Sequence, residues 1–423
     1  MVLAPLLILI LGEVPAGSGF WWDFSMAMGF TGMATMSVLF LLTARFRRAC
    51  APFGIDIIYY FHRYLAVLAV LMIYIHYLII RIVNEDALGT FNPLDAPWHM
   101  TSGRVALILL TGLIITSLWR KPLRIHYDQW RMLHIVLAVS AFLLAMGHIR
   151  GVNYYIEAPA KHWLWSGYSL IWVSLILYIR VLKPWKMHNK PYRVAELRQE
   201  RGNSWTLALE PEQHEGMDFM PGQFAWLVLR ASPWHVKEHP FSISCSAAQQ
   251  GRLEFTIKEL GDFTRTIKQI EVGERAYLDG PYGIFSTNLH PNAAGFVFIA
   301  GGVGAAPIIS MLRTLADRHD NRPLWFIYAN NRWQDVIFRE QLELLKARLK
   351  LTLVHVLTEP PADWQGESGF ITPQLLQKTL PSDAHKFEYF LCGPQPMSHA
   401  VHQGLNTLQV PLSQIHFELF DLV

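Results

Sequence analysis

The chain has 423 residues, of which 52% are apolar and 16% are charged, and its formal net charge is +3. This length leaves room for two or three domains, and the charged fraction is low for a soluble protein. The small net charge, without a basic cluster interleaved with aromatic residues, argues against nucleic-acid binding. Cys50, Cys245 and Cys392 lie far apart without C-x-x-C spacing, which argues against a disulfide scaffold, structural zinc and iron–sulfur ligation.

The apolar residues gather in the first part of the chain, in runs of the length that a bilayer requires. A membrane-spanning helix needs about 20 apolar residues. Such runs cover 20–43, 57–80, 104–119, 129–149 and 163–182, and a shorter sixth candidate covers 1–16. The small residues Ala16-Gly17-Ser18 also resemble a signal-peptide cleavage region, although no positive segment precedes residues 1–16. We predict an all-α bundle of six transmembrane helices in a domain covering 1–185.

Basic residues occur in alternate connections between these runs. They are Arg45, Arg47 and Arg48, then Arg120, Lys121 and Arg124, and finally Lys183, Lys186 and Lys190. The connection 84–103 carries acidic residues instead. The positive-inside rule therefore places the basic connections in the cytoplasm. Since the rest of the chain follows the third basic segment, we predict a multi-pass protein of the cell inner membrane, surrounded by lipid, with a cytoplasmic C-terminal part.

Four histidines lie on two of the predicted helices. His62 and His76 are 14 residues apart on one, and His134 and His148 are 14 residues apart on the other. At 100° per residue this spacing puts each pair on one helix face, about 21 Å apart along the axis. One span separates the two helices, so they run parallel. His62 is then level with His134 near the cytoplasm, and His76 with His148 near the outside.

These two levels predict two haem b groups, each bound by two histidines. Imidazole is an axial ligand of haem iron, and a bis-histidine haem needs two rings that face each other across a helix pair. Alternatively, membrane histidines form hydrogen bonds between helices, but two pairs with equal spacing favour haem. Arg63 and Arg131 flank the inner pair and could contact haem propionates or be interfacial charges.

The pattern of the second half of the chain is that of a β domain followed by an α/β domain. Short strands at 192–199, 205–209, 224–229, 253–259 and 276–278 predict a small antiparallel β-barrel within 186–290. In 291–423, strands alternate with helices, which predicts a doubly wound parallel sheet. The strand 295–300 ends in Gly301-Gly302-Val303-Gly304-Ala305-Ala306-Pro307 before a helix, a junction that suits a pyrophosphate.

In this order, these segments resemble the ferredoxin-NADP⁺ reductase type of flavin and nicotinamide module. Joined to the histidine-paired membrane part, the whole chain resembles the ferric reductase and NADPH oxidase superfamily. The resemblance implies FAD binding by His239, Pro240, Phe241, Ser242 and Ser244, and by a turn with Gly261 and Thr264 after Lys258. We expect Pro240 to fit a strand edge poorly, because proline cannot donate to a strand ladder.

The resemblance also implies a nicotinamide site. Gly301, Gly302, Gly304 and Pro307 match the family's glycine-rich turn, and Cys392, Gly393 and Pro394 match its second loop. Cys392 is then expected near hydride transfer, or is merely a small residue at a strand end. Phe420 is the expected aromatic cover of the flavin, with Phe417 as the alternative register.

The choice of nicotinamide depends on Arg332, which follows the strand ending at Asn331. Its guanidinium could pair with a 2′-phosphate, or it could be a solvated loop residue. No acidic residue stands at that strand end to favour the 2′-hydroxyl of NADH. We therefore predict NADPH, with NADH left open.

The resemblance implies a transmembrane oxidoreductase. Electrons would pass from cytoplasmic NADPH through FAD and the His62/His134 haem to the His76/His148 haem, and then to oxygen or a ferric or cupric chelate outside. One alternative is a subunit that donates electrons to a periplasmic redox protein. Another is a non-redox channel with a histidine proton relay. The oligomeric state stays open.

Overall fold

The computed structural model describes residues 2–11, 18–46, 55–235, 237–381 and 383–418. It divides into two compact units, with most of unit 1 before Pro184 and most of unit 2 from Trp185 onward. Each unit is described by itself. Phe420, the expected flavin cover, lies outside the described residues.

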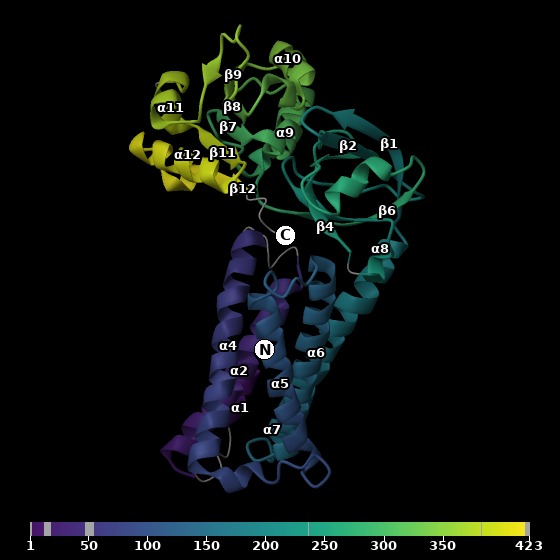
Figure 1. The fold of residues 1–423 in the computed structure, drawn as a ribbon, viewed down its shortest axis with the longest axis vertical. Helices are drawn as coiled ribbons and strands as arrows, with labels where there is room; N and C mark the ends of the chain where they lie inside the picture. Colours follow the sequence, from purple (N-terminus) through teal and green to yellow (C-terminus); the bar gives the residue numbers. More distant parts are fainter. Residues whose placement is uncertain (1, 12–17, 47–54, 236, 382, 419–423) are drawn as a thin grey trace. The chain divides into compact units, whose positions relative to one another are not determined.

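Unit 1 is helical. Its helices are α1 (Ala4–Ile10), α2 (Phe20–Thr43), α4 (Ile55–Val83), α5 (Trp98–Leu118), α6 (Tyr127–Val152) and α7 (Pro159–Leu177) (Figure 1). A π-helical turn, Tyr178–Leu182, joins α7 to α8 (Lys183–His188). Among the described residues, five helical stretches are long and apolar enough to cross a membrane: α2, α4, α5, α6 and the stretch Pro159–His188. Seven residues of α1 span only about 10 Å, against about 30 Å of hydrocarbon, so the predicted count of six is not confirmed.

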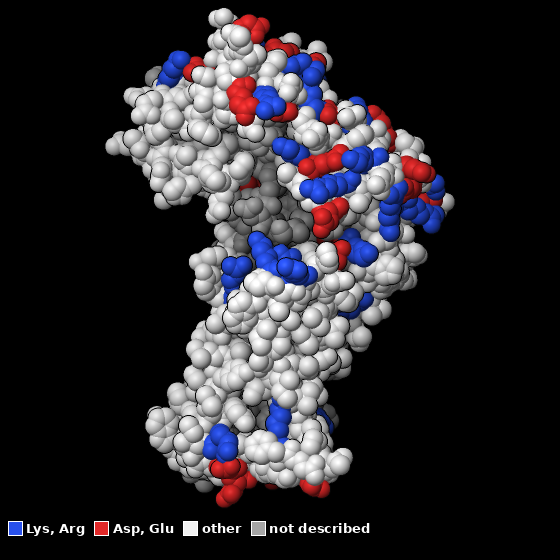
Figure 2. Space-filling model, viewed as in Figure 1, with Lys and Arg blue, Asp and Glu red and all other residues white. Residues whose placement is uncertain are grey.

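The interior of unit 1 is made of large apolar side chains from several helices. Phe142 of α6 and Trp165, Tyr168 and Trp172 of α7 are almost completely buried. Tyr168 is hydrogen-bonded to the buried Ser37 hydroxyl of α2. The outward-facing side chains are also apolar, and the middle of the helical unit shows almost no charged residue in Figure 2. A surface of this kind suits contact with lipid.

The first part of unit 2 is a curled antiparallel sheet of six strands. They are β1 (Tyr192–Glu200), β2 (Ser204–Pro211), β3 (Phe224–Leu229), β4 (His239–Ser242), β5 (Leu253–Lys258) and β6 (Arg275–Tyr282). Their order is β4-β3-β6-β1-β2-β5. A single bridge, Ile243 to Phe255, joins the segment after β4 to β5. A closed barrel therefore stays a prediction.

The second part of unit 2 is a parallel sheet in the order β10-β9-β8-β7-β11-β12. Its strands are β7 (Phe296–Gly301), β8 (Leu324–Asn330), β9 (Leu351–Leu357), β10 (Glu367–Ser368), β11 (Glu388–Cys392) and β12 (Ile415–Glu418). Helices α9 (Ala305–Asp317) and α10 (Arg339–Arg348) share one core with the sheet, and α11 (Pro373–Thr379) and α12 (Gln395–Thr407) share another. Both faces are thus covered. The strands are added outward in one direction from β7 to β10 and in the other from β11 to β12, so the strand order reverses between β7 and β11. Doubly wound sheets bind nucleotides at such a point.

Helix α9 also connects the two sheets of unit 2 through hydrogen bonds and an ion pair. Arg313 donates to the backbone oxygen of Ser244 at 2.7 Å and forms an ion pair with Glu254 at 3.0 Å. Ser310 donates to the backbone oxygen of Cys245 at 2.7 Å. These buried contacts hold the antiparallel sheet against the helix that follows the glycine-rich turn.

Candidate functional site

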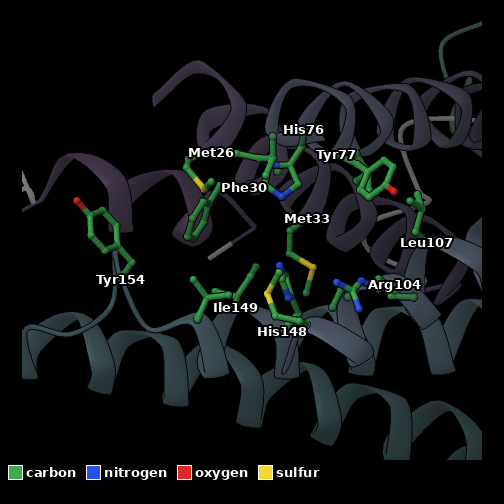
Figure 3. A pocket seen from close by; sticks show the side chains of 18 of the residues that line it. Met26, Phe30, Met33, His76, Tyr77, Arg104, Leu107, His148, Ile149 and Tyr154 are labelled. Atoms are coloured by element: carbon green, nitrogen blue, oxygen red, sulfur yellow. The ribbon is translucent and has the colours of Figure 1, made fainter. Parts of the chain in front are cut away.

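The structure brings the four membrane histidines together in two pairs. The rings of His62 on α4 and His134 on α6 have centroids 6.2 Å apart. His76 on α4 and His148 on α6 line one cavity of about 200 Å³ and point toward one another across it (Figure 3). Each pair joins the same two helices at a different level, as the spacing of 14 residues predicts.

The cavity between His76 and His148 is apolar. Its lining includes Met26, Phe30, Met33, Ile73, Leu107, Leu110 and Ile149. Among the described residues that line it, Arg104 is the one side chain with a formal charge. The Arg104 guanidinium donates to the backbone oxygens of Thr90 at 2.7 Å and Leu88 at 2.5 Å, while its buried Nε has no partner among the described residues. Arg104 was not among the predicted site residues, because it is the first residue of the predicted span 104–119 and nothing in its sequence context indicates a cavity.

The outer histidines are oriented by backbone carbonyl groups. The Nδ1 atom of His148 lies 2.8 Å from the backbone oxygen of His99, and that of His76 lies 3.0 Å from the backbone oxygen of Ser25. A carbonyl oxygen can only accept, so Nδ1 must carry the hydrogen in each ring. The Nε2 lone pair is therefore left for a ligand bond, which is how metal-binding histidines are commonly held.

Two glycines leave room for the outer rings. A Cβ atom on Gly103 of α5 would lie 2.7 Å from Nδ1 of His148, and one on Gly29 of α2 would lie 3.2 Å from Nδ1 of His76. Small residues let helices approach closely in membranes. Here they let a neighbouring helix pass directly behind each histidine.

The inner pair is held less firmly. Ser117 of α5 donates to the backbone oxygen of Leu113 at 2.7 Å, so its oxygen can accept from Nδ1 of His134, 3.2 Å away. Nδ1 of His62 is buried and has no hydrogen-bond partner among the described residues. Arg63 is exposed at this level and Arg131 is partly buried.

Both pairs fit a haem iron. Two imidazoles that each bind one metal ion through nitrogen at about 2 Å would have ring centroids about 6 Å apart. The separation of 6.2 Å between His62 and His134 agrees with that value. At the outer level, the anchored Nδ1 atoms and the apolar cavity between the rings fit the same group.

The residues expected at the flavin begin in β4. The ring of His239 stacks on Phe263 with centroids 3.9 Å apart and an interplanar angle of 20°. Pro240 pairs in register with Trp226 of β3. The expectation that Pro240 fits a strand edge poorly is therefore wrong: β4 is the edge strand, the one position where the missing N–H costs no ladder bond.

Two of the hydroxyl groups expected at the flavin, those of Ser244 and Thr264, already have partners. Ser242 and Ser244 are buried, and the Ser244 hydroxyl lies 3.1 Å from that of Thr256. Thr264 accepts from the backbone N–H groups of Leu260 and Gly261 at 2.9 and 2.8 Å, which shapes the expected turn after Lys258. A phosphate at this turn would compete for the same N–H groups.

The two nucleotide loops meet at the carboxyl ends of β7 and β11. A Cβ atom on Gly304 would lie 2.2 Å from the backbone oxygen of Cys392, and one on Gly301 would lie 2.9 Å from both Pro394 and Met397. These glycines let the turn before α9 lie directly on the Cys392–Pro394 loop. Pro307 sits in the first turn of α9, where its missing N–H is not needed.

Cys392 itself lies in the core. Its side chain is fully buried, and burial raises the pKa of its thiol. The thiol can therefore act at a nicotinamide only after a local rearrangement. Phe417 in β12 is partly exposed, and its ring lies 5.5 Å from that of His402.

Arg332 forms an ion pair across two neighbouring strand ends. Its Nε donates to the carboxylate of Glu359 at 2.7 Å, and both side chains are more than half exposed. Glu359 follows the neighbouring strand, β9, and its N–H donates to the backbone oxygen of Asn331. An acidic residue therefore does stand at this sheet edge, contrary to the expectation from the sequence. Its position directly after the next strand could have indicated this.

Comparison with known families agrees with this layout. Residues 28–145 match the ferric reductase like transmembrane component, residues 191–286 match an FAD-binding domain, and residues 298–403 match an oxidoreductase NAD-binding domain. The chain has the ferric reductase and NADPH oxidase-type architecture. These matches give the chain a transmembrane region followed by an FAD-binding domain and an oxidoreductase NAD-binding domain.

Individual relatives of this ferric reductase-type chain match only part of it. NADH-cytochrome b5 reductase 1 of Candida albicans is 35% identical over 37% of this chain and 54% of its own length. The propane 2-monooxygenase reductase component of Rhodococcus jostii is 31% identical over 51% of this chain and 59% of its own length. The chain thus spans little more than half the length of these curated relatives. A flavohem-like FAD/NAD-binding domain from Vibrio cholerae nitric oxide dioxygenase, 22% identical, covers 55% of this chain and 98% of its own, with a TM-score of 0.48.

Proposed function

We propose that this ferric reductase-type chain moves electrons from NADPH through FAD and two bis-histidine haems to an acceptor on the opposite face of the membrane. The observation that supports it most is the geometry of the histidines. Two pairs join α4 and α6, and backbone carbonyl groups orient both rings of the outer pair with Nε2 free. When bound, the cofactors supply the conversion of a hydride into single electrons and their transfer across the bilayer.

The side chains of unit 1 would bind and position the haems. His62 with His134 would hold one haem iron, and His76 with His148 would hold the other, through their ring nitrogens. At the outer level, Arg104 provides a positive charge at an apolar cavity, where it can stabilise a propionate or a negatively charged acceptor. The apolar lining keeps water away from this level.

In unit 2, the chain's own groups would bind the two nucleotides. The backbone between Gly301 and Gly304, at the N-terminus of α9, favours a pyrophosphate. The stacked rings of His239 and Phe263 offer an aromatic surface beside the expected flavin segment. Arg332 would select the 2′-phosphate of NADPH by exchanging Glu359 for the phosphate.

The same proposal sets the orientation in the inner membrane. Basic connections, with Arg45 and Arg120–Arg124 among them, alternate with the acidic loop around Glu85. Figure 2 shows acidic side chains, with some basic ones beside them, at one end of the helical unit. The positive-inside rule then makes unit 2 cytoplasmic, and His76 and His148 the pair nearer the outside.

Two acceptor classes follow from an outer haem near the surface: oxygen and ferric or cupric chelates. A protein acceptor is the second candidate, because the relative from Rhodococcus jostii is named as the reductase component of a monooxygenase. The channel alternative is set aside, since the architecture is that of an oxidoreductase.

The decisive experiment uses the purified full chain with its cofactors. We expect two haems per polypeptide by pyridine haemochrome assay, and both reduced by NADPH under anaerobic conditions. Admitting oxygen or a ferric chelate should then reoxidise them, with superoxide formed only in the first case. One haem or none per polypeptide would refute the proposal, and reoxidation only after adding a protein fraction would favour the partner alternative.

A further inference from the structure

Two histidines and one glutamate meet in unit 2, away from the nucleotide loops. Glu388 is the first residue of β11, His416 lies in β12, and His290 lies in the connection before β7. Parallel pairing puts Glu388 beside Phe296, the first residue of β7. This is the amino edge of the sheet, and at about 3.3 Å per residue it lies about 13 Å from the other edge at Cys392. We call the three residues the His-Glu-His cluster.

The ligand atoms of the His-Glu-His cluster are close. Nε2 of His416 lies 2.7 Å from one carboxylate oxygen of Glu388, and Nδ1 of His290 lies 3.6 Å from the same oxygen. The two rings have centroids 4.2 Å apart, and one ligand atom from each residue lies within 4.8 Å of the others. Three separate segments thus direct polar atoms at one point.

These distances match a small divalent cation. Zinc takes imidazole nitrogen and carboxylate oxygen at about 2.0–2.2 Å in tetrahedral geometry, which puts neighbouring ligand atoms about 3.3 Å apart. The distances of 2.7 and 3.6 Å fall on either side of that value. The side chains of His290, Glu388 and His416 are 24%, 17% and 22% exposed, so they are shielded while a water molecule can still reach a fourth position.

A simple hydrogen-bonded group accounts for less of this arrangement. The bond from His416 to Glu388 is enough to satisfy a partly buried carboxylate. The second ring, His290, is still held beside both, packed against Phe390. The neighbouring cation, Arg322, is neutralised by Asp320, to which it donates at 2.6 and 3.0 Å, and it donates to backbone oxygens of His290 and Pro291. Arg322 therefore holds the His290 loop in place, and because Asp320 neutralises its charge it repels a bound cation only weakly.

We propose that His290, Glu388 and His416 form a binding site for one zinc-like divalent cation, with water as a further ligand. The bound cation would join three elements at this edge: the connection between the two sheets, β11 and the four-residue edge strand β12, which pairs with β11. Since β12 ends the described chain, the cation would fasten the last strand to the sheet. The site lies at the edge of the sheet opposite to the glycine-rich turn and the Cys392–Pro394 loop.

The test uses untagged full chain, loaded with haem and flavin, so that the cofactor histidines are already occupied. Zinc bound after equilibrium dialysis is measured per polypeptide by mass spectrometry for wild type, Glu388→Gln, His290→Ala and His416→Ala. His399→Ala, an exposed histidine on α12, is the matched control. We expect one more zinc ion in wild type and His399→Ala than in the cluster variants. Their affinity should fall about 100-fold or more, since even outer-shell partners are worth 10–100-fold.

Thermal unfolding of unit 2, followed by flavin release, provides the second measurement. Zinc should raise the midpoint of wild type and leave that of Glu388→Gln unchanged, because a ligand stabilises only the state that binds it. Glu388→Gln keeps the shape and a hydrogen-bonding oxygen, so it stays informative if a histidine variant loses flavin. Equal zinc content in wild type and Glu388→Gln would overturn the proposal, as would loss of zinc in His399→Ala.

Discussion

In unit 1, three of the four histidines expected to bind haem, His76, His134 and His148, are held through Nδ1 by oxygen atoms behind them. In unit 2, the groups expected to bind nucleotides are instead held by partners that a ligand must replace. His148 donates through Nδ1 to a carbonyl and keeps Nε2 free. Arg332 is paired with Glu359, and the N–H groups before Thr264 are bonded to its hydroxyl. The arrangement in unit 1 suits a permanently bound group, because no side chain has to move when the group binds. The arrangement in unit 2 suits ligands that bind and dissociate in each turnover.

The difference has an energetic basis. A preorganised site spends little free energy on ordering its side chains when the ligand binds. An exposed ion pair such as Arg332 with Glu359 is weak, so a phosphate can displace it readily. The haem half should therefore respond to substitutions in an all-or-none way, and the nucleotide half in a graded way.

The largest effect is expected from removing an outer histidine. His148→Ala or His76→Ala should lower the haem content from two to one per polypeptide and abolish electron transfer to the external acceptor. NADPH should still reduce the flavin, because that step precedes the haems. Haem assay and stopped-flow flavin reduction measure the two outcomes, with His162→Ala as the control. Loss of flavin reduction in a folded variant would show that the order of carriers is wrong.

The next largest effect should come from the space behind the outer rings. Gly103→Ala places a Cβ atom 2.7 Å from Nδ1 of His148, and Gly29→Ala places one 3.2 Å from Nδ1 of His76. The first contact is too short for His148 to stay in place, while the second needs a shift of only a few tenths of an ångström. Alanine favours helix over glycine, so a loss cannot be assigned to a weaker helix.

Haem content and the absorption spectrum measure this pair of variants. Gly103→Ala should lose the outer haem or change its spectrum, and Gly29→Ala should keep it. If both variants retain two normal haems, the outer histidine rings are not fixed in position by the atoms behind them.

Nucleotide selection should change in a graded way. Arg332→Ala should raise KM for NADPH about tenfold and leave KM for NADH nearly unchanged, because a charge-assisted contact to the 2′-phosphate is lost. Glu359→Gln should lower KM for NADPH a few-fold, because the competing carboxylate is gone. Arg348→Ala, which removes another exposed arginine paired with an acid, Asp317, is the matched control. Equal changes for NADPH and NADH would place Arg332 at a shared part of the nucleotides.

The sequence predicted what depends on periodicity. The run 20–43 coincides with α2, and the equal histidine spacing predicted two levels on parallel helices. Helix ends were less accurate: α5 begins at Trp98, six residues before the predicted 104, because polar residues such as His99 and Ser102 broke the apolar run. The parallel sheet was predicted from its alternation of strands and helices.

Contacts between distant residues could not be predicted. Nothing in the chain order links Ser25 to His76, since this contact depends on how the helices pack. The position of Glu359 after the next strand was a signal, but its contact with Arg332 depends on β8 and β9 being neighbours in the sheet. The His-Glu-His cluster joins residues 290, 388 and 416, which only the sheet order brings together. Pro240 was misjudged for the same reason: its tolerance depends on β4 being at the edge.

The smallest effect should separate the two histidine levels. Ser117→Ala removes the side-chain oxygen at Nδ1 of His134, whereas Ser25→Ala leaves the backbone oxygen at Nδ1 of His76 in place. A hydrogen-bonded Nδ1 makes the imidazole a stronger donor to the metal. Losing the bond should therefore raise the potential of the inner haem by about 20–65 mV, which corresponds to about 0.5–1.5 kcal/mol for one electron.

The reduction potential of the haem at each level can be measured alone. Ser117→Ala is measured by spectroelectrochemistry in the His148→Ala background, which keeps only the inner haem, and Ser25→Ala in the His134→Ala background, which keeps only the outer one. We expect a positive shift in the first and almost none in the second. A shift of equal size in both would mean that the Ser25 hydroxyl, 3.0 Å from Nδ1 of His76, matters as much as the carbonyl. The outer level would then be held by side chains, as the inner one is, and the contrast between the two levels would not hold.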